Sequence, residues 1–539
     1  MIGSSDFRIE NGVLLSYVGQ DAEAEIPYGV TAIGSDAFAF HTDLVRVSIP
    51  DTVTHIHSGA FFGCDSLTAV CLPDSIVSME DNIFSGCSAL REIHLPDSLT
   101  AIGTGTFKGC SGLADARGFV IVRNVLFDYF GQGGEVTVPD SVTILGSEVF
   151  RGRADLTAIR IPDSVNAVAD RAFEGCTGLT VISLPDSIVS VGNNILSGCT
   201  GLKSVKLPDN IASAGDNILS GCSGLADEQG FVIVSHTLYG YFGSGGEISV
   251  PDHVTAISNG VFKNCRALTS IHLPDSVTDI RFEAFQGCTG LTAIRFPDSI
   301  KTMEDNILSG CSSLRELHLP SGLTTIGKRA FRGCSALTAV RVPNSVCLID
   351  NSAFRNCRRL AQVELPGAGV SIENNIFKGC DALADEQGLV IVNGVLYDYV
   401  GQGGRVSLPD SIHTIRDGAF AMCGRLTAVH IPNGVTTIGE AAFTDCTALT
   451  EITFPDTLLF LGNRAFCGCT ALTQVILPES LLSIGSRAFC GCTALTTLHI
   501  PDRTGSMGYD ALADCDSLTD LRIPPHLTPK KDEQPLFPF

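Results

Sequence analysis

Hydrophobic residues recur along this chain with a period of 23 residues, and a proline marks each repeat. Residues 156–178 read LTAIRIPDSVNAVADRAFEGCTG. Ile159 and Ile161 alternate with Arg160, as in a strand with one buried face. Pro162 then ends the strand, because proline cannot donate a hydrogen bond to a β-ladder. The window therefore predicts a short strand, a turn, a second apolar step and a further turn that carries an aromatic residue.

The proline register extends over almost the whole chain. Prolines within a block lie 23 residues apart, and 20 of the 24 prolines keep this register. Eleven residues after the proline, every full coil has Phe or Leu, from Phe38 to Leu512. One coil cannot bury such a column, so we expect the coils to stack into a continuous core. The register residues are Pro27, Pro50, Pro73, Pro96, Pro139, Pro162, Pro185, Pro208, Pro251, Pro274, Pro297, Pro320, Pro343, Pro366, Pro409, Pro432, Pro455, Pro478, Pro501 and Pro524.

A second unit interrupts the coils at regular places. Its copies read GFVIVRNVLFDYFGQGGEVTVP, GFVIVSHTLYGYFGSGGEISVP and GLVIVNGVLYDYVGQGGRVSLP, and DFRIENGVLLSYVGQDAEAEIP at the N-terminus is a fourth. Each has two β-rich runs separated by turn residues, which predicts a β-hairpin. We place these hairpin units at residues 7–27, 119–139, 231–251 and 389–409.

The coil consensus, L-x-x-I-x-I-P-D-S-V-x-x-I-G-x-x-A-F-x-G-C, resembles the BspA-like, or Treponema-type, class of leucine-rich repeats. The resemblance covers residues 6 to about 524. It implies a curved repeat solenoid with a parallel β-sheet on one face, short strands or turns on the other, and the hairpins as insertions. Members are typically surface or secreted proteins of host-associated bacteria and protozoan parasites. Several are adhesins for extracellular-matrix or other host proteins.

We expect a single solenoid over residues 1–524 and a flexible Pro-rich tail over residues 525–539. The resemblance implies a cell-surface or secreted location. The N-terminus shows no basic segment followed by an apolar run, and the C-terminus shows no hydrophobic anchor. A cytoplasmic location therefore stays open as the alternative.

Composition narrows the range of partners. The chain is 44% hydrophobic and 17% charged, which excludes general disorder. Its formal net charge of -23 argues against nucleic acid, since phosphate binding needs a concentrated basic surface. Apolar runs are too short to cross a bilayer. We therefore expect a monomer that does not insert into membranes.

Cysteine follows the register as closely as proline does. Seventeen of the 21 cysteines stand fourteen residues after the proline, from Cys64 to Cys515. Free cysteine behaves as a small buried hydrophobe, so we interpret the column as a structural ladder of reduced thiols. Cys467 and Cys490 stand off this register in adjacent coils. Whether they pair or bind a metal stays open.

Two other patterns have ordinary structural explanations. The Gly-rich segments at residues 131–134, 243–246 and 401–404 lead into predicted strands and not into a helix, so we interpret them as hairpin turns and not as phosphate-binding loops. Asp follows the register proline in thirteen coils, from Asp51 to Asp502. Calcium could bridge stacked carboxylates, but Pro-Asp is also a common turn pair. We predict neither a metal nor a cofactor.

The outward face of the predicted strand carries an excess of His, Lys and Arg. Two residues before the register proline, ten of the 20 coils have His, Lys or Arg. Four consecutive coils place His272, Arg295, His318 and Arg341 there, a stripe of about 15 Å at strand spacing. Charged outward residues keep a flat sheet soluble. The alternative is a binding stripe for carboxylates, sulfates or acidic loops of a protein, and these four are the candidate ligand-binding residues.

No catalytic constellation stands out from the repeat, because Ser, His and Asp occur at register positions that describe coil geometry. We therefore expect a non-enzymatic binding or adhesion protein that presents its sheet face to host proteins or glycans. Extracellular-matrix proteins are among the partners implied by the resemblance. An intracellular scaffold or secreted effector with the same solenoid is the alternative, and a purely structural array is a third possibility.

Overall fold

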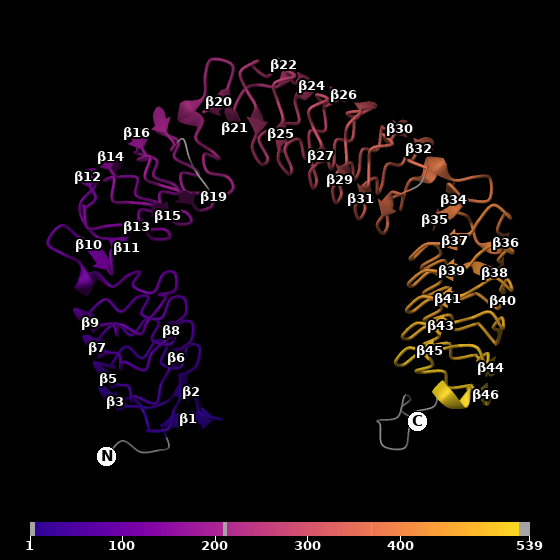
Figure 1. Ribbon diagram of the computed structural model, residues 1–539, viewed down its shortest axis with the longest axis horizontal. Coiled ribbons are helices and arrows are strands. Elements are labelled where there is room, and N and C mark those ends of the chain that lie inside the picture. Colours follow the sequence, from indigo (N-terminus) through magenta and orange to yellow (C-terminus); the bar gives the residue numbers. More distant parts are fainter. Residues whose placement is uncertain (1–5, 209–212, 368, 528–539) are drawn as a thin grey trace. The chain divides into compact units, whose positions relative to one another are not determined.

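The computed structural model describes residues 6–208, 213–367 and 369–527. The chain divides into two compact units, Met1–Gly243 and Ser244–Phe539, which we call the N-terminal and C-terminal units. Each unit is a stack of coils made of short strands and turns (Figure 1). Asp209 of the Pro-Asp column and residues 528–539 of the predicted tail lie outside the described residues.

One coil has the form that the hydrophobic pattern predicts. In β14 (Leu156–Arg160), Ile159 is buried and Arg160 is exposed, so the strand alternation is confirmed. The chain turns after Pro162 and enters β15 (Ala167–Val168), where Val168 is buried. A turn then brings Phe173 into the core at 0% exposure.

First strands of successive coils pair in parallel and in register, as Ile271 of β24 opposite Ile294 of β26 illustrates. Their outward residues form a continuous polar surface within each sheet, which we call the sheet face. In the N-terminal unit these strands are β3 (Glu23–Glu25), β5 (Arg46–Ser48), β7 (Ala69–Cys71), β9 (Glu92–His94), β12 (Gly134–Thr137), β14, β16 (Val181–Ser183) and β18 (Ser204–Lys206). In the C-terminal unit they are β22 (Gly246–Ser249), β24 (Leu268–His272), β26 (Ala293–Arg295), β28 (Glu316–His318), β30 (Ala339–Arg341), β32 (Gln362–Glu364), β36 (Gly404–Ser407), β38 (Leu426–His430), β40 (Glu451–Thr453), β42 (Gln474–Ile476), β44 (Thr497–His499) and β46 (Asp520–Arg522).

Second strands are only two residues long and form a separate parallel ladder, as Ile415 opposite Ile438 illustrates. In the N-terminal unit they are β4 (Ala32–Ile33), β6 (His55–Ile56), β8 (Ser78–Met79), β13 (Ile144–Leu145), β15, β17 (Ser190–Val191) and β19 (Ser213–Ala214). In the C-terminal unit they are β23 (Ala256–Ile257), β25 (Asp279–Ile280), β27 (Thr302–Met303), β29 (Thr325–Ile326), β31 (Leu348–Ile349), β33 (Ser371–Ile372), β37 (Thr414–Ile415), β39 (Thr437–Ile438), β41 (Phe460–Leu461), β43 (Ser483–Ile484) and β45 (Ser506–Met507).

The four predicted hairpins are confirmed as antiparallel strand pairs, each with a register shift in its first strand. Their second strands lead into the second-strand ladder, as Leu126 opposite Leu145 shows. The pairs are β1 (Phe7–Glu10) with β2 (Val13–Tyr17), β10 (Phe119–Val122) with β11 (Val125–Tyr129), β20 (Phe231–Val234) with β21 (Thr237–Tyr241), and β34 (Leu389–Val392) with β35 (Val395–Tyr399).

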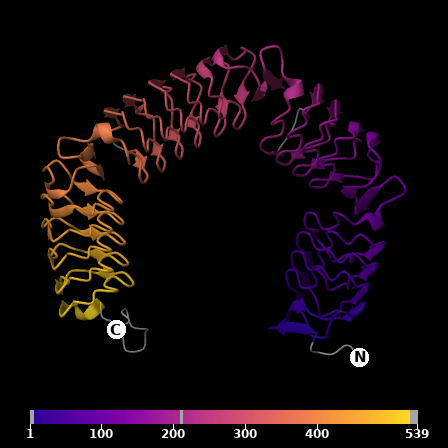
Figure 2. The same ribbon diagram turned by 180° about the vertical axis from the view of Figure 1, so that it is seen from behind.

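The aromatic column forms the centre of the core. In the coils that follow β35, which stack one on another in both views (Figures 1 and 2), Phe420, Phe443, Phe466 and Phe489 are all 0% exposed. Adjacent ring centroids lie 4.8, 5.0 and 5.4 Å apart, and the rings are stacked within 9° of parallel. Each coil therefore completes the core of its neighbours, as the column predicted.

Polar register residues bind adjacent coils together. The Cys469 thiol is buried and donates to the carbonyl of Phe443 at 3.1 Å, and most ladder cysteines repeat this contact. The structural interpretation of the cysteine column is thus confirmed. The serine of Pro-Asp-Ser has a similar role: the Ser276 hydroxyl donates to the carbonyl of Val254 at 2.7 Å.

Helical structure among the described residues consists of four 3₁₀ turns of three residues each, η1 (Ser111–Leu113), η2 (Ser223–Leu225), η3 (Asp381–Leu383) and η4 (Pro525–Leu527). The first three directly precede hairpins, at the point where a coil gives way to an antiparallel pair. Over the part of the chain that the structure describes, no helix has the length and apolar character to span a membrane.

Candidate binding surface

The four candidate residues lie on the sheet face of the C-terminal unit, and we call them the basic stripe: His272, Arg295, His318 and Arg341. They are the last residues of β24, β26, β28 and β30, and all four side chains are exposed. The parallel register places Arg295 directly opposite His318. β30 belongs to a separate two-stranded sheet with β32, so Arg341 continues the stripe across a break in the ladder.

Arg341 is the member of the stripe whose charge is paired. Its Nε lies 3.1 Å from a carboxylate oxygen of Glu364, the opposite residue on β32. Both side chains are highly exposed, at 84% and 71%, so water screens this pair and leaves it easily replaced. Within the described residues, His272, Arg295 and His318 take part in no ion pair. The stripe therefore offers exposed donors to an external acceptor.

In other coils, most of the basic side chains two residues before the register proline contact a residue of a neighbouring coil. The ammonium of Lys206 lies 2.9 Å from Asp186, His499 lies 3.2 Å from Asp520, and His430 contacts the hydroxyl of Thr453 at 2.8 Å. These partners come from neighbouring coils, and all of the contacts are exposed. The basic stripe differs from the rest of its column because its Arg and His residues lie on consecutive coils and, within the described residues, three of the four take part in no ion pair.

A second column of charge, which was not predicted from the sequence, lies two residues earlier on the same strands. Seven of the 20 coils carry Glu or Asp there, including Glu316 beside His318 on β28. On β36 and β40 this position holds Arg405 and Glu451, whose side chains are 2.9 Å apart, and the hydrogen bond from Arg405 lowers the pKa of Glu451. Alternation along each strand was the signal that could have revealed it.

Two shallow grooves also lie on the sheet face, away from the basic stripe. In the N-terminal unit a groove of about 600 Å³ runs over β5, β7 and β9, with Arg46, Cys71 and His94 in its lining. In the C-terminal unit a groove of about 490 Å³ runs over β42 and β44, with His499 in its lining beside Ile476, which is 75% exposed. Both combine apolar floor residues with charged rims, and neither was predicted from the sequence.

The Gly-rich segments and the two cysteines off the register were the other candidates for a chemical role. Gly134 and Gly404 are the first residues of β12 and β36, so these Gly-rich segments lead into strands as predicted. Cys467 and Cys490 are both free and half-buried, and burial raises the pKa of Cys490 to about 11. Across the described ranges, no group of three or more His, Cys, Asp or Glu side chains is arranged to hold a metal ion.

Comparison with known proteins supports one family. A family model described as "BspA type Leucine rich repeat region (6 copies)" matches residues 20–118, 120–229, 246–384 and 405–533, which is well over half of the chain. Among solved structures, a leucine-rich repeat protein from Bacteroides ovatus is 28% identical, with 70% of this chain and 91% of that chain covered and a TM-score of 0.32.

A leucine rich cell surface protein from Faecalibacterium prausnitzii is 25% identical, with 76% and 92% covered and a TM-score of 0.33. A leucine rich repeat protein from T. pallidum is also 25% identical, with 50% and 91% covered and a TM-score of 0.21. Among curated proteins, none matches this chain.

Proposed function

The chain belongs to the BspA-type leucine-rich-repeat family, and from that premise we propose that it is an adhesion-type protein that binds host proteins or glycans through its sheet face. Leucine-rich-repeat families are typically protein-binding and are generally non-enzymatic scaffolds. The observation that carries the proposal is the basic stripe, a run of exposed Arg and His side chains on consecutive coils of an acidic protein.

The chemistry of the stripe favours an acidic ligand. Arg295 presents a planar guanidinium that can donate two parallel hydrogen bonds to a carboxylate or sulfate. His272 and His318 flank it on the neighbouring strands and donate from their ring nitrogens. We propose acidic loops of a host protein or sulfated glycans as the ligands, and the exposed Arg341–Glu364 pair as a contact that the ligand exchanges.

The family resemblance favours presentation at the cell surface or secretion. A second candidate is an intracellular scaffold or secreted effector that uses the same face for protein partners. The exposed thiols of Cys71 and Cys347 favour it, because exposed free cysteines suit a reducing compartment better than an oxidising one. Surface protease shaving of intact cells separates the two: a protein that is cleaved only after lysis contradicts the adhesion proposal.

The direct test is a binding panel of host matrix proteins and sulfated glycans with the variant Arg295→Glu plus Arg341→Glu. We expect binding to fall at least tenfold, because two cations become anions on the proposed contact surface. The matched control is Lys301→Glu plus Arg332→Glu, which changes the net charge equally at exposed positions off the sheet face. Equal binding by wild type and both variants would rule the stripe out, and so would equal loss in both variants.

A further inference from the structure

Two places where coils give way to a hairpin can be compared within this one chain. The first lies between β8 and the β10–β11 hairpin, and the second lies between β33 and the β34–β35 hairpin. Both have the same ring arrangement: Phe107 contacts Phe127 edge-on at 5.1 Å, and Phe377 contacts Tyr397 edge-on at 5.1 Å. The two junctions are thus copies of one structure, and their differences are informative.

An arginine fills the second junction. Arg416 follows β37, and its Nη2 donates to the carbonyl of Ile372 and, at 3.0 Å, to that of Glu373. Its guanidinium also lies over the Tyr397 ring, 5.9 Å from the centroid. These carbonyls belong to the last coil before the hairpin, where no following coil continues the ladder. Arg416 therefore supplies the donor that the interrupted ladder lacks.

The first junction has a glycine in the same place and is open. Gly146 follows β13 as Arg416 follows β37. A pocket of about 380 Å³ lies beside it, mostly apolar, lined by Ile102, Phe127 and Ile144 among others. Ile102 and Gly103 correspond to Ile372 and Glu373. Among the described residues no hydrogen-bond donor reaches the Ile102 carbonyl, while Gly103 accepts a bond from the hydroxyl of Thr106 at 2.8 Å.

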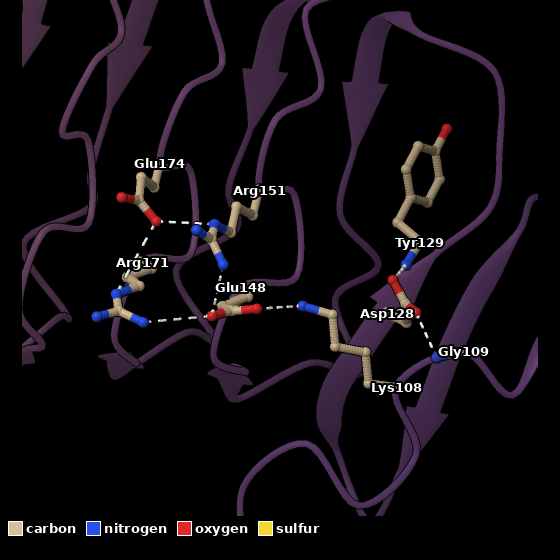
Figure 3. Close-up of polar contacts among 8 residues, drawn as sticks. All are labelled: Lys108, Gly109, Asp128, Tyr129, Glu148, Arg151, Arg171 and Glu174. Atoms are coloured by element: carbon tan, nitrogen blue, oxygen red, sulfur yellow. Dashed lines mark hydrogen bonds and ion pairs between the residues drawn. The ribbon is translucent and has the colours of Figure 1, made fainter. Parts of the chain in front are cut away.

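A network of ion pairs holds the two coils beside this pocket together. Lys108, from the coil before the hairpin, donates to Glu148, from the coil after it, at 2.5 Å (Figure 3). Glu148 also lies 3.0 Å from Arg151 and 3.5 Å from Arg171. Asp128 of the hairpin accepts the amide of Gly109 at 2.8 Å. Ion pairs and a hydrogen bond therefore connect the hairpin and the coils on both sides of the pocket.

We propose that this pocket, at the junction of residues 100–146, binds an arginine side chain presented by a protein partner. The pocket offers the same two kinds of group that Arg416 contacts at the second junction. They are an aromatic ring, here that of Phe127, and a backbone carbonyl without a donor among the described residues, here that of Ile102. This inference rests on the proposed protein-binding function and adds a second contact, distant in sequence from the basic stripe and opposite to it in charge preference.

Two carboxylates on the coils around the pocket favour a cation. Asp81 and Asp170 take part in no ion pair among the described residues, whereas Glu148 is already paired with Lys108, Arg151 and Arg171. The chain as a whole carries a net charge of -23.

The cationic side chain in the pocket lining is Arg123, and its guanidinium donates to the carbonyls of Pro96 and Leu99, which are not lining residues. Arg123 thus donates to two carbonyls that precede Ile102 in the chain. The carbonyl of Ile102 is left to accept a hydrogen bond from the guanidinium of the bound arginine.

The probe is the peptide acetyl-Gly-Arg-Gly-amide, compared with its citrulline analogue, which has the same shape and no charge. Binding is followed by NMR of isoleucine methyl groups in the full chain. We expect the arginine peptide to shift the methyl signals of Ile102 and Ile144, and to bind at least tenfold more tightly than the citrulline peptide. Equal binding of both peptides, or of neither, overturns the proposal.

Two variants test whether the arginine peptide binds in the pocket beside Gly146. Gly146→Arg fills the pocket as Arg416 fills its own, and we expect it to abolish the shifts. A Cβ at residue 146 would lie 2.6 Å from the carbonyl oxygen of Leu126, so the backbone must move slightly to admit the side chain. Amide exchange unchanged from wild type in coils away from the junction is the control that this variant folds. Arg416→Gly opens the second junction, and we expect new shifts at Ile372. Binding that survives Gly146→Arg refutes the site. The peptide does not touch the sheet face, so failure here leaves the Arg295→Glu plus Arg341→Glu test unaffected, and the converse also holds.

Discussion

Truncation of one ring in the aromatic column should weaken the solenoid locally and strongly. Phe443 is 0% exposed and stacks on Phe420 at 4.8 Å and on Phe466 at 5.0 Å. Phe443→Ala in such a core costs about 3–5 kcal/mol. Two stacked neighbours favour the upper part of that range, because each ring pair adds about 0.5–1.5 kcal/mol beyond burial. Phe443→Leu should cost much less, about 1.5 kcal/mol or below, since Leu308 fills the same position in another coil.

Amide hydrogen exchange of the full chain measures this loss coil by coil. Coils contact only their neighbours, so opening is local. For Phe443→Ala, protection of amides in residues 437–470 should fall by about two to three and a half orders of magnitude, at 1.4 kcal/mol per tenfold. Peptides from the N-terminal unit should be unchanged and serve as the internal control. A uniform loss over both units, or a loss below about tenfold near Phe443, would refute nearest-neighbour packing as the basis of stability.

Two further predictions concern titratable groups. The hydrogen bond and charge of Lys108 lower the pKa of Glu148 below its ordinary 4.5, so its stabilising contribution should be complete above pH 4.5 and lost as the pH falls through the lowered value. The difference in thermal unfolding midpoint between wild type and Glu148→Gln should shrink over that acid range, and a difference independent of pH would contradict the assignment. Burial raises the pKa of Cys110 to about 12, so iodoacetamide at mildly alkaline pH should label exposed Cys71 and Cys347 and spare Cys110 in the native chain. Peptide mass spectrometry that finds Cys110 labelled as fast as Cys71 would show that the thiol ladder is open.

Features that repeat could be predicted from the sequence, because every coil buries the same register residues against its neighbours. Phe443 must be buried since a single coil has no other core, and the pattern around Pro162 defines strand and turn without knowledge of neighbours. The cysteine column was interpreted correctly as buried, although its hydrogen bond to the preceding coil, from Cys469 to Phe443, needed coordinates.

Features that depend on an exception could not be predicted. Arg416 and Ile372 are 44 residues apart, and Lys108 and Glu148 are 40 apart, so neither pair falls on the 23-residue period. Each hairpin insertion separates two coils that the 23-residue period would make adjacent. Only the folded chain shows which side chain connects the coil before the hairpin to the coil after it. Gly146 stands at the consensus glycine of the coil, so the repeat pattern does not distinguish it from other coil glycines. The charge of the basic stripe was visible in the sequence, whereas the Arg341–Glu364 pair and the ladder break before it were not.

The central claim, that partners dock on the sheet face, is tested most directly by photo-crosslinking from defined positions. A benzoylphenylalanine placed at His318 lies on that face, and one at Lys328 is exposed on the turn after β29. With a partner found by the binding panel, the account predicts crosslinks from position 318 and none from position 328. Crosslinks from 328 and none from 318 would contradict it.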